Sequence, residues 1–329
     1  PSREKGGARL SCPGPVDGRE VSMQGFGRFL TYRVVRMLIA LWSVVTVVFV
    51  VMRLSGDPVP LLLPPGAPIA EMERLRHEMG LDRPIYVQYG VFINQAVRGD
   101  FGRSIHFRTS AMTVVWERVP ATLELAFASF LCAIVVAIPA GIISAVRRGS
   151  IIDDVVMGVA LVGQAAPTFY IGIMLILTCS LWLGLFPTSG RGDWRNLILP
   201  AVTLGAFAMA SIARITRSAV LEILRADYIR TARAKGLPEF WTLAKHTMRN
   251  AAIPIVTIVG LQLGNLLGGA VVTETIFSWP GIGRLAIQSI YNRDYPVVQS
   301  CVFITAAMFV VVNFLVDVAY GILDPRIRH

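Results

Sequence analysis

The sequence predicts an all-α membrane protein with six transmembrane helices. Three observations point to this class. Only 16% of the 329 residues are charged, whereas a soluble domain carries about a quarter. Hydrophobic residues make up 54% of the chain and the mean hydropathy is +0.60. The third observation is a series of uncharged runs, several of them long enough to cross a bilayer.

The six expected spans follow one another along the chain. The first lies within residues 29–53, where 37–52 are uncharged, and arginines at both ends can extend it. The third run is the longest, and we expect a helix at about 154–183 with a kink at Pro167. The fourth is expected to continue as helix past Arg214 and Arg217. The other spans are expected at 125–146, 196–213, 250–273 and 295–316.

Polar segments divide the rest of the chain. Residues 1–28 are rich in Gly, Pro, Arg and Ser and are expected to form a disordered or extension tail. Residues 54–118 form a long segment with helices expected at 69–79, ended by Gly80, and from 85 to about 97, which together make a small cap. Residues 119–329 hold the second to sixth spans and form the core.

The distribution of Lys and Arg predicts the orientation. With the N-terminus inside, nineteen of the 31 basic residues lie in inner segments and four in short outer loops. Cytoplasmic loops carry the excess of basic residues. We therefore expect both termini to be cytoplasmic, together with the polar block at residues 227–250, and the cap to be external.

The block at 227–250 reads as helix, stop, helix. Ala232 and Ala234 favour a helix, Gly236 supplies a C-terminal stop, and Pro238 suits the first turn of the next helix. Two interpretations remain open on this pattern alone: a basic amphipathic loop on the lipid headgroups, or a docking surface for a soluble partner.

Polar residues inside the apolar runs are candidate pathway-lining residues. Gln262 and Asn265 place amides at mid-depth in the fifth run, and polar groups in lipid are expensive unless they face a partner or a wet cavity. Gly260, Gly264 and Gly268 predict close approach of another helix. Gln164 and Asn313 are further candidates, and Asp317 is expected to be solvated or paired.

Enzyme chemistry finds no support in the sequence. No Cys or His pair has metal-ligand spacing, no hydrolase motif is present, and no phosphate-binding loop occurs, so we expect no catalytic residue, metal or cofactor in this chain. The basic residues flank apolar runs rather than alternating with aromatics, which argues against nucleic acid as a partner. An ion-coupled secondary carrier and a membrane scaffold stay as alternatives, although no inverted repeat is visible.

The polar block matches a known pattern. Its residues follow Tyr-x-x-x-Ala-x-Ala-Lys-Gly and then His, Asn and Pro, at Tyr228, Ala232, Ala234, Lys235, Gly236, His246, Asn250 and Pro254. This resembles the EAA loop of the permease subunits of ABC importers, in the dipeptide, oligopeptide and nickel branch. Other segments resemble that branch in order: GDP at 56–58, GLDRP at 80–84, GDFGRS at 99–104, PATLELA at 120–126, ETIFSWPGIGRL at 274–285, RDYPVVQ at 293–299 and DPRIR at 324–328.

The resemblance implies the fold of a type I ABC importer permease in the plasma or inner membrane. The loop would be a coupling helix in which the small Ala232 and Ala234 enter a cleft of a cytoplasmic ATPase. Arg230, Arg233 and Lys235 would meet an acidic rim. Arg230 stands where the wider superfamily has an acid, and Asp227 is a nearby substitute. ATP and Mg would be bound by partner subunits.

The implied assembly contains a second, homologous permease, two cytoplasmic ABC ATPases, an external substrate-binding protein and the lipid bilayer. The expected cargo is a di- or oligopeptide, with nickel or another small ligand as the alternative.

Overall fold

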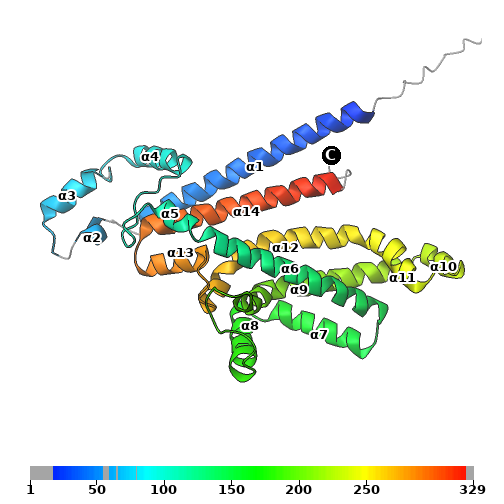
Figure 1. Ribbon diagram of the computed structural model, residues 1–329. Helices are drawn as coiled ribbons and strands as arrows, with labels where there is room; N and C mark the ends of the chain where they lie inside the picture. Colours follow the sequence, from blue (N-terminus) through cyan, green and yellow to red (C-terminus); the bar gives the residue numbers. More distant parts are fainter. Residues whose placement is uncertain (1–17, 55–58, 64–65, 79, 324–329) are drawn as a thin grey trace, which may run out of the picture.

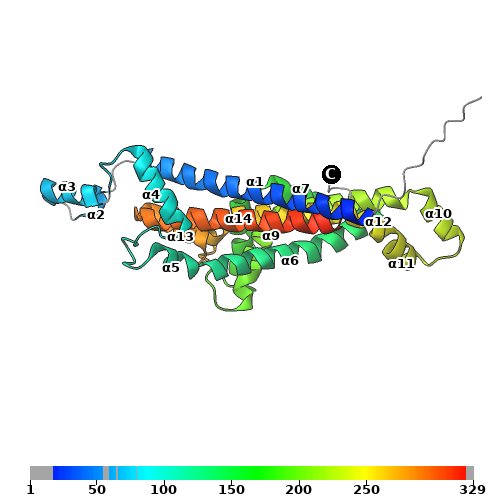
Figure 2. The same ribbon diagram turned by 90° about the horizontal axis from the view of Figure 1, so that it is seen from above.

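The computed structural model describes residues 18–54, 59–63, 66–78 and 80–323, and these form an elongated helical bundle (Figures 1 and 2). Within these residues the extended structure is limited to an isolated bridge between Arg103 and Ser110. The long helices are α1 (Gly18–Leu54), α6 (Val119–Val146), α9 (Trp194–Leu224), α12 (Met248–Ile276) and α14 (Tyr295–Leu323).

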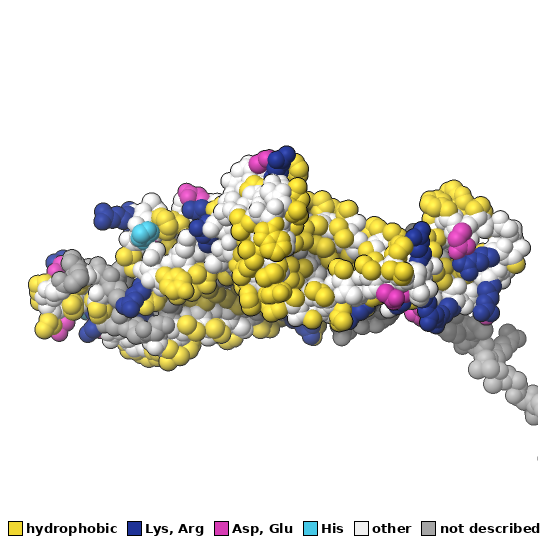
Figure 3. Space-filling model, turned by 90° about the horizontal axis from the view of Figure 1, so that it is seen from below, with side chains coloured by type: hydrophobic (Ala, Val, Ile, Leu, Met, Phe, Trp, Pro, Cys, Tyr) yellow, Lys and Arg dark blue, Asp and Glu magenta, His cyan; other side chains and the backbone are white. Residues whose placement is uncertain are grey.

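Five helical segments of the described chain are long and apolar enough to cross a membrane: Thr31–Val51, Ala111–Val146, Trp194–Leu224, Glu239–Ile276 and Tyr295–Val318. A bent pair brings the number to six if it counts as one span. Figure 3 shows hydrophobic side chains over the middle of one face, with most Lys and Arg toward the two ends. This distribution agrees with the predicted class of membrane protein.

The third run is broken more sharply than a kinked helix. Helix α7 (Ile151–Ala165) and the following α8 (Thr168–Leu175) with η1 (Ile176–Trp182) meet at 116°. Pro167 is the N-cap of α8, and Ala166 before it is extended, with φ −77° and ψ 135°. The residue before a proline avoids the helical region, so the break falls at the predicted place.

Helices α6 and α9 form the centre of the bundle. A Cβ placed at Gly141 of α6 would lie 2.6 Å from the Ala213 carbonyl oxygen of α9. Only a glycine permits this approach. The buried cluster at this interface extends onto α12 through Leu266 and Ala270 and ends at Trp279, next to the end of α12.

Helices α1 and α14 lie side by side along one edge (Figures 1 and 2). Arg33 of α1 donates a hydrogen bond to Asp317 of α14, so the expectation that Asp317 is paired is confirmed. The start of α1 and the end of α14 lie at the same end of the bundle as α10 (Asp227–Ala234). This agrees with a chain that crosses the membrane an even number of times.

The cap at the opposite end contains α2 (Val59–Leu62), α3 (Ile69–Glu78), α4 (Ile85–Val97) and α5 (Ala111–Trp116). Gly80 ends α3 with φ +64°, and the two predicted helices of the segment are confirmed within a residue. Aromatic contacts join Phe49 of α1 to Phe92 of α4, Phe92 to Phe101, and Phe101 to Phe303 of α14. The cap is therefore attached to the α1–α14 pair.

The expected tail differs from the structure in one part. Residues 18–28 belong to α1, whose apolar span begins at Thr31, and residues 1–17 lie outside those described. The DPRIR motif at 324–328 and the GDP motif at 56–58 also fall outside the described residues.

Candidate functional site

The block at 227–250 forms a hairpin beyond the long helices. Helix α10 (Asp227–Ala234) is followed by Gly236, with φ +79°, and then by α11 (Glu239–Trp241) and the π-helical η2 (Thr242–Thr247), which leads into α12. The predicted helix, stop and helix are present. Pro238 is the N-cap of α11 and lies one position outside the helix.

Two side-chain contacts hold the hairpin. The Asn250 amide Nδ2 donates to the Tyr228 hydroxyl at 3.0 Å and to the His246 carbonyl oxygen at 2.9 Å. Arg233 donates Nε and Nη2 to the two oxygens of Glu239, at 3.1 and 2.5 Å. This hydrogen-bonded carboxylate raises the pKa of Arg233. The first contact joins the start of α10 to the start of α12, and the second closes the turn at Gly236.

The buried side of α10 faces the protein itself. Ile229 is fully buried and Ala232 is 8% exposed, while α10 packs against η2. The Ala232 methyl group is covered by its own chain in this conformation, and the expectation that it enters a partner's cleft stays a prediction. Ala234 is exposed, as expected.

The outer side of the hairpin is basic with an aromatic tip. Its exposed residues include Asp227, Tyr228, Arg230, Arg233, Ala234, Lys235 and Gly236. Arg230 is paired at 3.5 Å with Asp227, one helical turn earlier, and both side chains are largely in solvent. Phe240 and Trp241 add apolar area, 71% and 56% exposed. Trp241 was not among the residues predicted from the sequence, since an aromatic pair in a polar block carries no pattern that marks a binding surface.

The candidate pathway residues do not form one cluster. Gln262 is 4% exposed and accepts a hydrogen bond at 3.3 Å from Asn265, which is exposed. Asn313 of α14 lies against Gly264, where a Cβ would be 2.7 Å from its Oδ1, so this glycine permits the predicted close approach. At Gly268 a Cβ would meet nothing within 4 Å. Gln164 is half-buried near the end of α7.

A buried acidic centre at the cap end was missed as a site. Glu274 is fully buried and accepts hydrogen bonds from the Thr122 hydroxyl at 2.7 Å and from the Arg284 amide at 3.0 Å. The Trp279 indole donates to the Ala121 carbonyl oxygen at 2.8 Å. The motifs at 120–126 and 274–285 thus meet in space, which their separation in sequence conceals.

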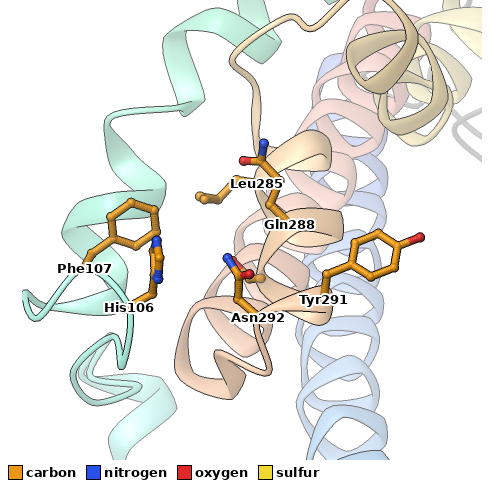
Figure 4. Close-up of a pocket in the computed structure, with 7 residues that line it drawn as sticks. His106, Phe107, Leu285, Gln288, Tyr291 and Asn292 are labelled. Carbon is orange, nitrogen blue, oxygen red and sulfur yellow. The ribbon is translucent and has the colours of Figure 1, made fainter.

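Near this centre lies a pocket of about 370 Å³ between the loop after α4 and α13 (Ile282–Tyr291). His106 and Phe107 form one wall, and Leu285, Gln288 and Asn292 form the other, while Tyr291 points away (Figure 4). Beside it, Asp294 is 1% exposed and accepts hydrogen bonds from the Ser104 hydroxyl and the His106 amide, at 2.5 and 3.1 Å.

A third buried carboxylate lies at the α10 end. Asp153 of α7 is 3% exposed and is paired with Arg217 of α9 through two hydrogen bonds of 2.6 and 2.7 Å. An Asp in the first turn of an apolar run is an ordinary cap in sequence, and only the fold brings Arg217 to it. In the described part of the chain, no group of three or more His, Cys, Asp or Glu residues has the arrangement of a metal site.

Comparison with known proteins places the chain in a family. Residues 137–329 match the model of the "Binding-protein-dependent transport system inner membrane component". The di/tripeptide transport system permease protein DppB of Pseudomonas aeruginosa is 41% identical, covering 92% of this chain and 98% of its own. The glutathione transport system permease protein GsiC of Escherichia coli K12 is also 41% identical, over 92% and 99%.

Solved structures support the fold. A chain of the inward-facing MetNI methionine ABC transporter aligns with a TM-score of 0.55 and 21% identity, over 65% of this chain and 97% of its own. Another crystal form gives 0.52 and 22%. Since the family model matches more than half of the chain and the relatives match nearly all of it, this protein belongs to the binding-protein-dependent transport system inner membrane components and is a multi-pass inner-membrane permease of an ABC importer.

Proposed function

We propose that this chain forms half of the translocation pathway of an ATP-driven importer for di- or oligopeptides. The observation that carries this proposal is 41% identity over 92% of the chain to permeases named for di/tripeptide and glutathione transport. Both named cargoes are short peptides, which favours a peptide over nickel or another small ligand. The chain supplies no catalytic residue of its own.

The proposed assembly adds a second, homologous permease, two cytoplasmic ATPase subunits that bind ATP and Mg, and an external substrate-binding protein. The hairpin at 227–250 is the proposed contact with an ATPase. Its exposed basic face and the exposed Phe240 and Trp241 suit a protein surface with an acidic rim and an apolar centre. The orientation follows: both termini and this hairpin are cytoplasmic, and the cap is external.

Two contacts make the hairpin suitable for transmitting movement. Ile229 and Ala232 are buried against the chain's own structure, and Asn250 joins α10 to the first turn of α12. A force on α10 is therefore passed to α9 on one side and α12 on the other. We propose Gln262, Asn265, Gln164 and Asn313 as pathway residues, and the exposure of Asn265 supports a place for it on a surface shared with the second permease.

An experiment on the assembled importer tests this function. The complete transporter in proteoliposomes, with binding protein and a labelled dipeptide, is expected to import only when ATP is supplied to the cytoplasmic side. An ion-coupled carrier would instead import without ATP and stop with a protonophore.

A matched pair of variants tests the hairpin. Arg230→Glu reverses a charge on the exposed face of α10 and is expected to lower ATP-dependent uptake about tenfold, a typical size for a disrupted coupling. Arg98→Glu makes the same change at an exposed position in the cap end and is expected to leave the ATPase contact intact. Normal uptake by Arg230→Glu would contradict the proposed contact.

A further inference from the structure

The carboxylate of Asp153 joins three helices at the α10 end of the bundle. Arg217 of α9 donates Nε to Oδ1 at 2.6 Å and Nη2 to Oδ2 at 2.7 Å. Ser144 of α6 donates its hydroxyl to Oδ1 at 2.5 Å, and the Gly149 amide in the turn between α6 and α7 donates to Oδ2 at 3.0 Å. Each carboxylate oxygen therefore accepts two hydrogen bonds.

This arrangement specifies geometry more than it adds stability. A buried ion pair is weak evidence for stability, because apolar residues of similar volume often serve as well. A two-point contact between a guanidinium and a carboxylate fixes direction as well as distance. The position of α7 relative to α9 is therefore set by Asp153 and Arg217, and the Ser144 and Gly149 bonds bring the end of α6 into the same unit.

Helix α9 leads directly into the proposed coupling helix. Arg217 lies seven residues before Leu224, the last residue of α9, or about 10 Å along the axis. The link to α10 is short and hydrogen-bonded: the Arg225 amide donates to the Glu222 carbonyl at 3.3 Å, and the Ala226 amide to the Ile223 carbonyl at 3.0 Å. A displacement of α10 thus reaches Arg217 through continuous, closely held backbone.

The three helices also approach each other closely away from the ion pair. A Cβ at Gly141 of α6 would lie 2.6 Å from the Ala213 carbonyl oxygen, and one at Gly163 of α7 would lie 3.3 Å from the Ala206 carbonyl oxygen. Both neighbours are on α9. Close-packed helices of this kind move as a body rather than deforming separately.

We propose that Asp153 and Arg217 are positioning residues that fasten α6 and α7 to α9, so that movement of α10 displaces the three helices together. This inference rests on the proposed coupling function of the hairpin at 227–250. Neither residue is expected to contact ATP or the transported molecule. Their role is to keep the movement of α10 from being lost at the α7–α9 interface.

The test measures uptake of a labelled dipeptide and ATP hydrolysis in the same proteoliposomes, each normalised to the amount of assembled complex. Asp153→Asn keeps the shape and removes the charge. We expect ATP hydrolysis to stay within about twofold while uptake falls about tenfold, so that the ATP consumed per dipeptide rises. Arg217→Lys keeps the charge but loses the two-point contact. The ATP that it consumes per imported dipeptide is expected to lie between the values for wild type and Asp153→Asn.

Glu124→Gln is the matched control. Glu124 of α6 pairs with Arg191 at 2.6 Å at the other end of the bundle, where both side chains are about 40% exposed. Loss of this ion pair is expected to leave the ATP consumed per imported dipeptide unchanged. If Asp153→Asn does not assemble, Arg217→Lys decides the question.

An unchanged ratio of ATP consumed to dipeptide imported would overturn the proposal, including the case in which both activities fall together. Arg230→Glu in the same preparation separates this outcome from failure of the proposed function. Normal uptake by Arg230→Glu means that the hairpin is not the coupling site. Impaired uptake by Arg230→Glu with an unchanged ratio in Asp153→Asn and Arg217→Lys means that only the fastening role is wrong.

Discussion

The chain packs so tightly around the buried Glu274 carboxylate that even an added methyl group would clash with it. The carboxylate accepts hydrogen bonds from Thr122 and from the Arg284 amide, and the chain turns tightly around it. A Cβ at Gly281 would lie 2.1 Å from Glu274 Oε1. The backbone at Gly281 is extended, with φ −97°, so this glycine is required by space and not by conformation.

Gly281→Ala is therefore expected to destabilise the protein. The added methyl group must displace a buried carboxylate, and overpacking of this kind costs about 1–3 kcal/mol. The measurement is the apparent melting temperature of the purified protein in detergent. Gly268→Ala is the control, because a Cβ there would meet nothing within 4 Å. Equal melting temperatures for the two variants would contradict the account of the Glu274 centre.

At the scale of elements, the break between α7 and α8 shows which features of a helix break the sequence predicts. Pro167 marks where the third run is interrupted, because the residue before a proline avoids the helical region. The size of the bend depends on contacts made elsewhere. A Cβ at Gly172 of α8 would lie 3.2 Å from Thr203 and 3.3 Å from Phe277. Both neighbours are far from Gly172 in the sequence. The location was predictable, and the angle of 116° was not.

The same distinction applies to the candidate site. The helix, stop and helix of residues 227–250 were predictable from Gly236 and Pro238, whose effects are local. The burial of Ala232 was not, since it depends on how α10 packs against η2. The pair of Asp153 and Arg217 was equally hidden, because 64 residues separate them and only the fold brings them together.

The contact between Tyr228 and Asn250 gives a prediction for α10 as an element. Tyr228→Phe removes a hydrogen bond of 3.0 Å, worth about 0.5–1.5 kcal/mol when both partners are protein groups. Amides of residues 227–236 are expected to exchange hydrogen faster in this variant, as measured by mass spectrometry. Asn250→Ala should have a similar effect, and the double variant should add little to either. Additive effects would mean that the two side chains act separately.

At the scale of the whole molecule, both ends of the described chain lie at the same end of the bundle as α10, and the cap lies at the other (Figure 1). From the distribution of Lys and Arg we propose that this end, with α10, is cytoplasmic.

Cysteine labelling tests this orientation. In a background from which the native cysteines have been replaced by Ser, Lys235→Cys is expected to react with a membrane-impermeant maleimide only after the cells are opened. Arg98→Cys, exposed in the cap end, is expected to react in intact spheroplasts. The reverse pattern would show that the cap is cytoplasmic.

The central claim is that an ATPase subunit binds the hairpin at 227–250, and cross-linking measures this contact directly. A photoreactive amino acid at Lys235, which is exposed at the end of α10, is expected to capture an ATPase subunit in the assembled importer. The same group at Arg98 is expected to capture none. Absence of an ATPase cross-link from Lys235, Arg230 and Trp241 alike, in a complex that imports substrate, would contradict the claim.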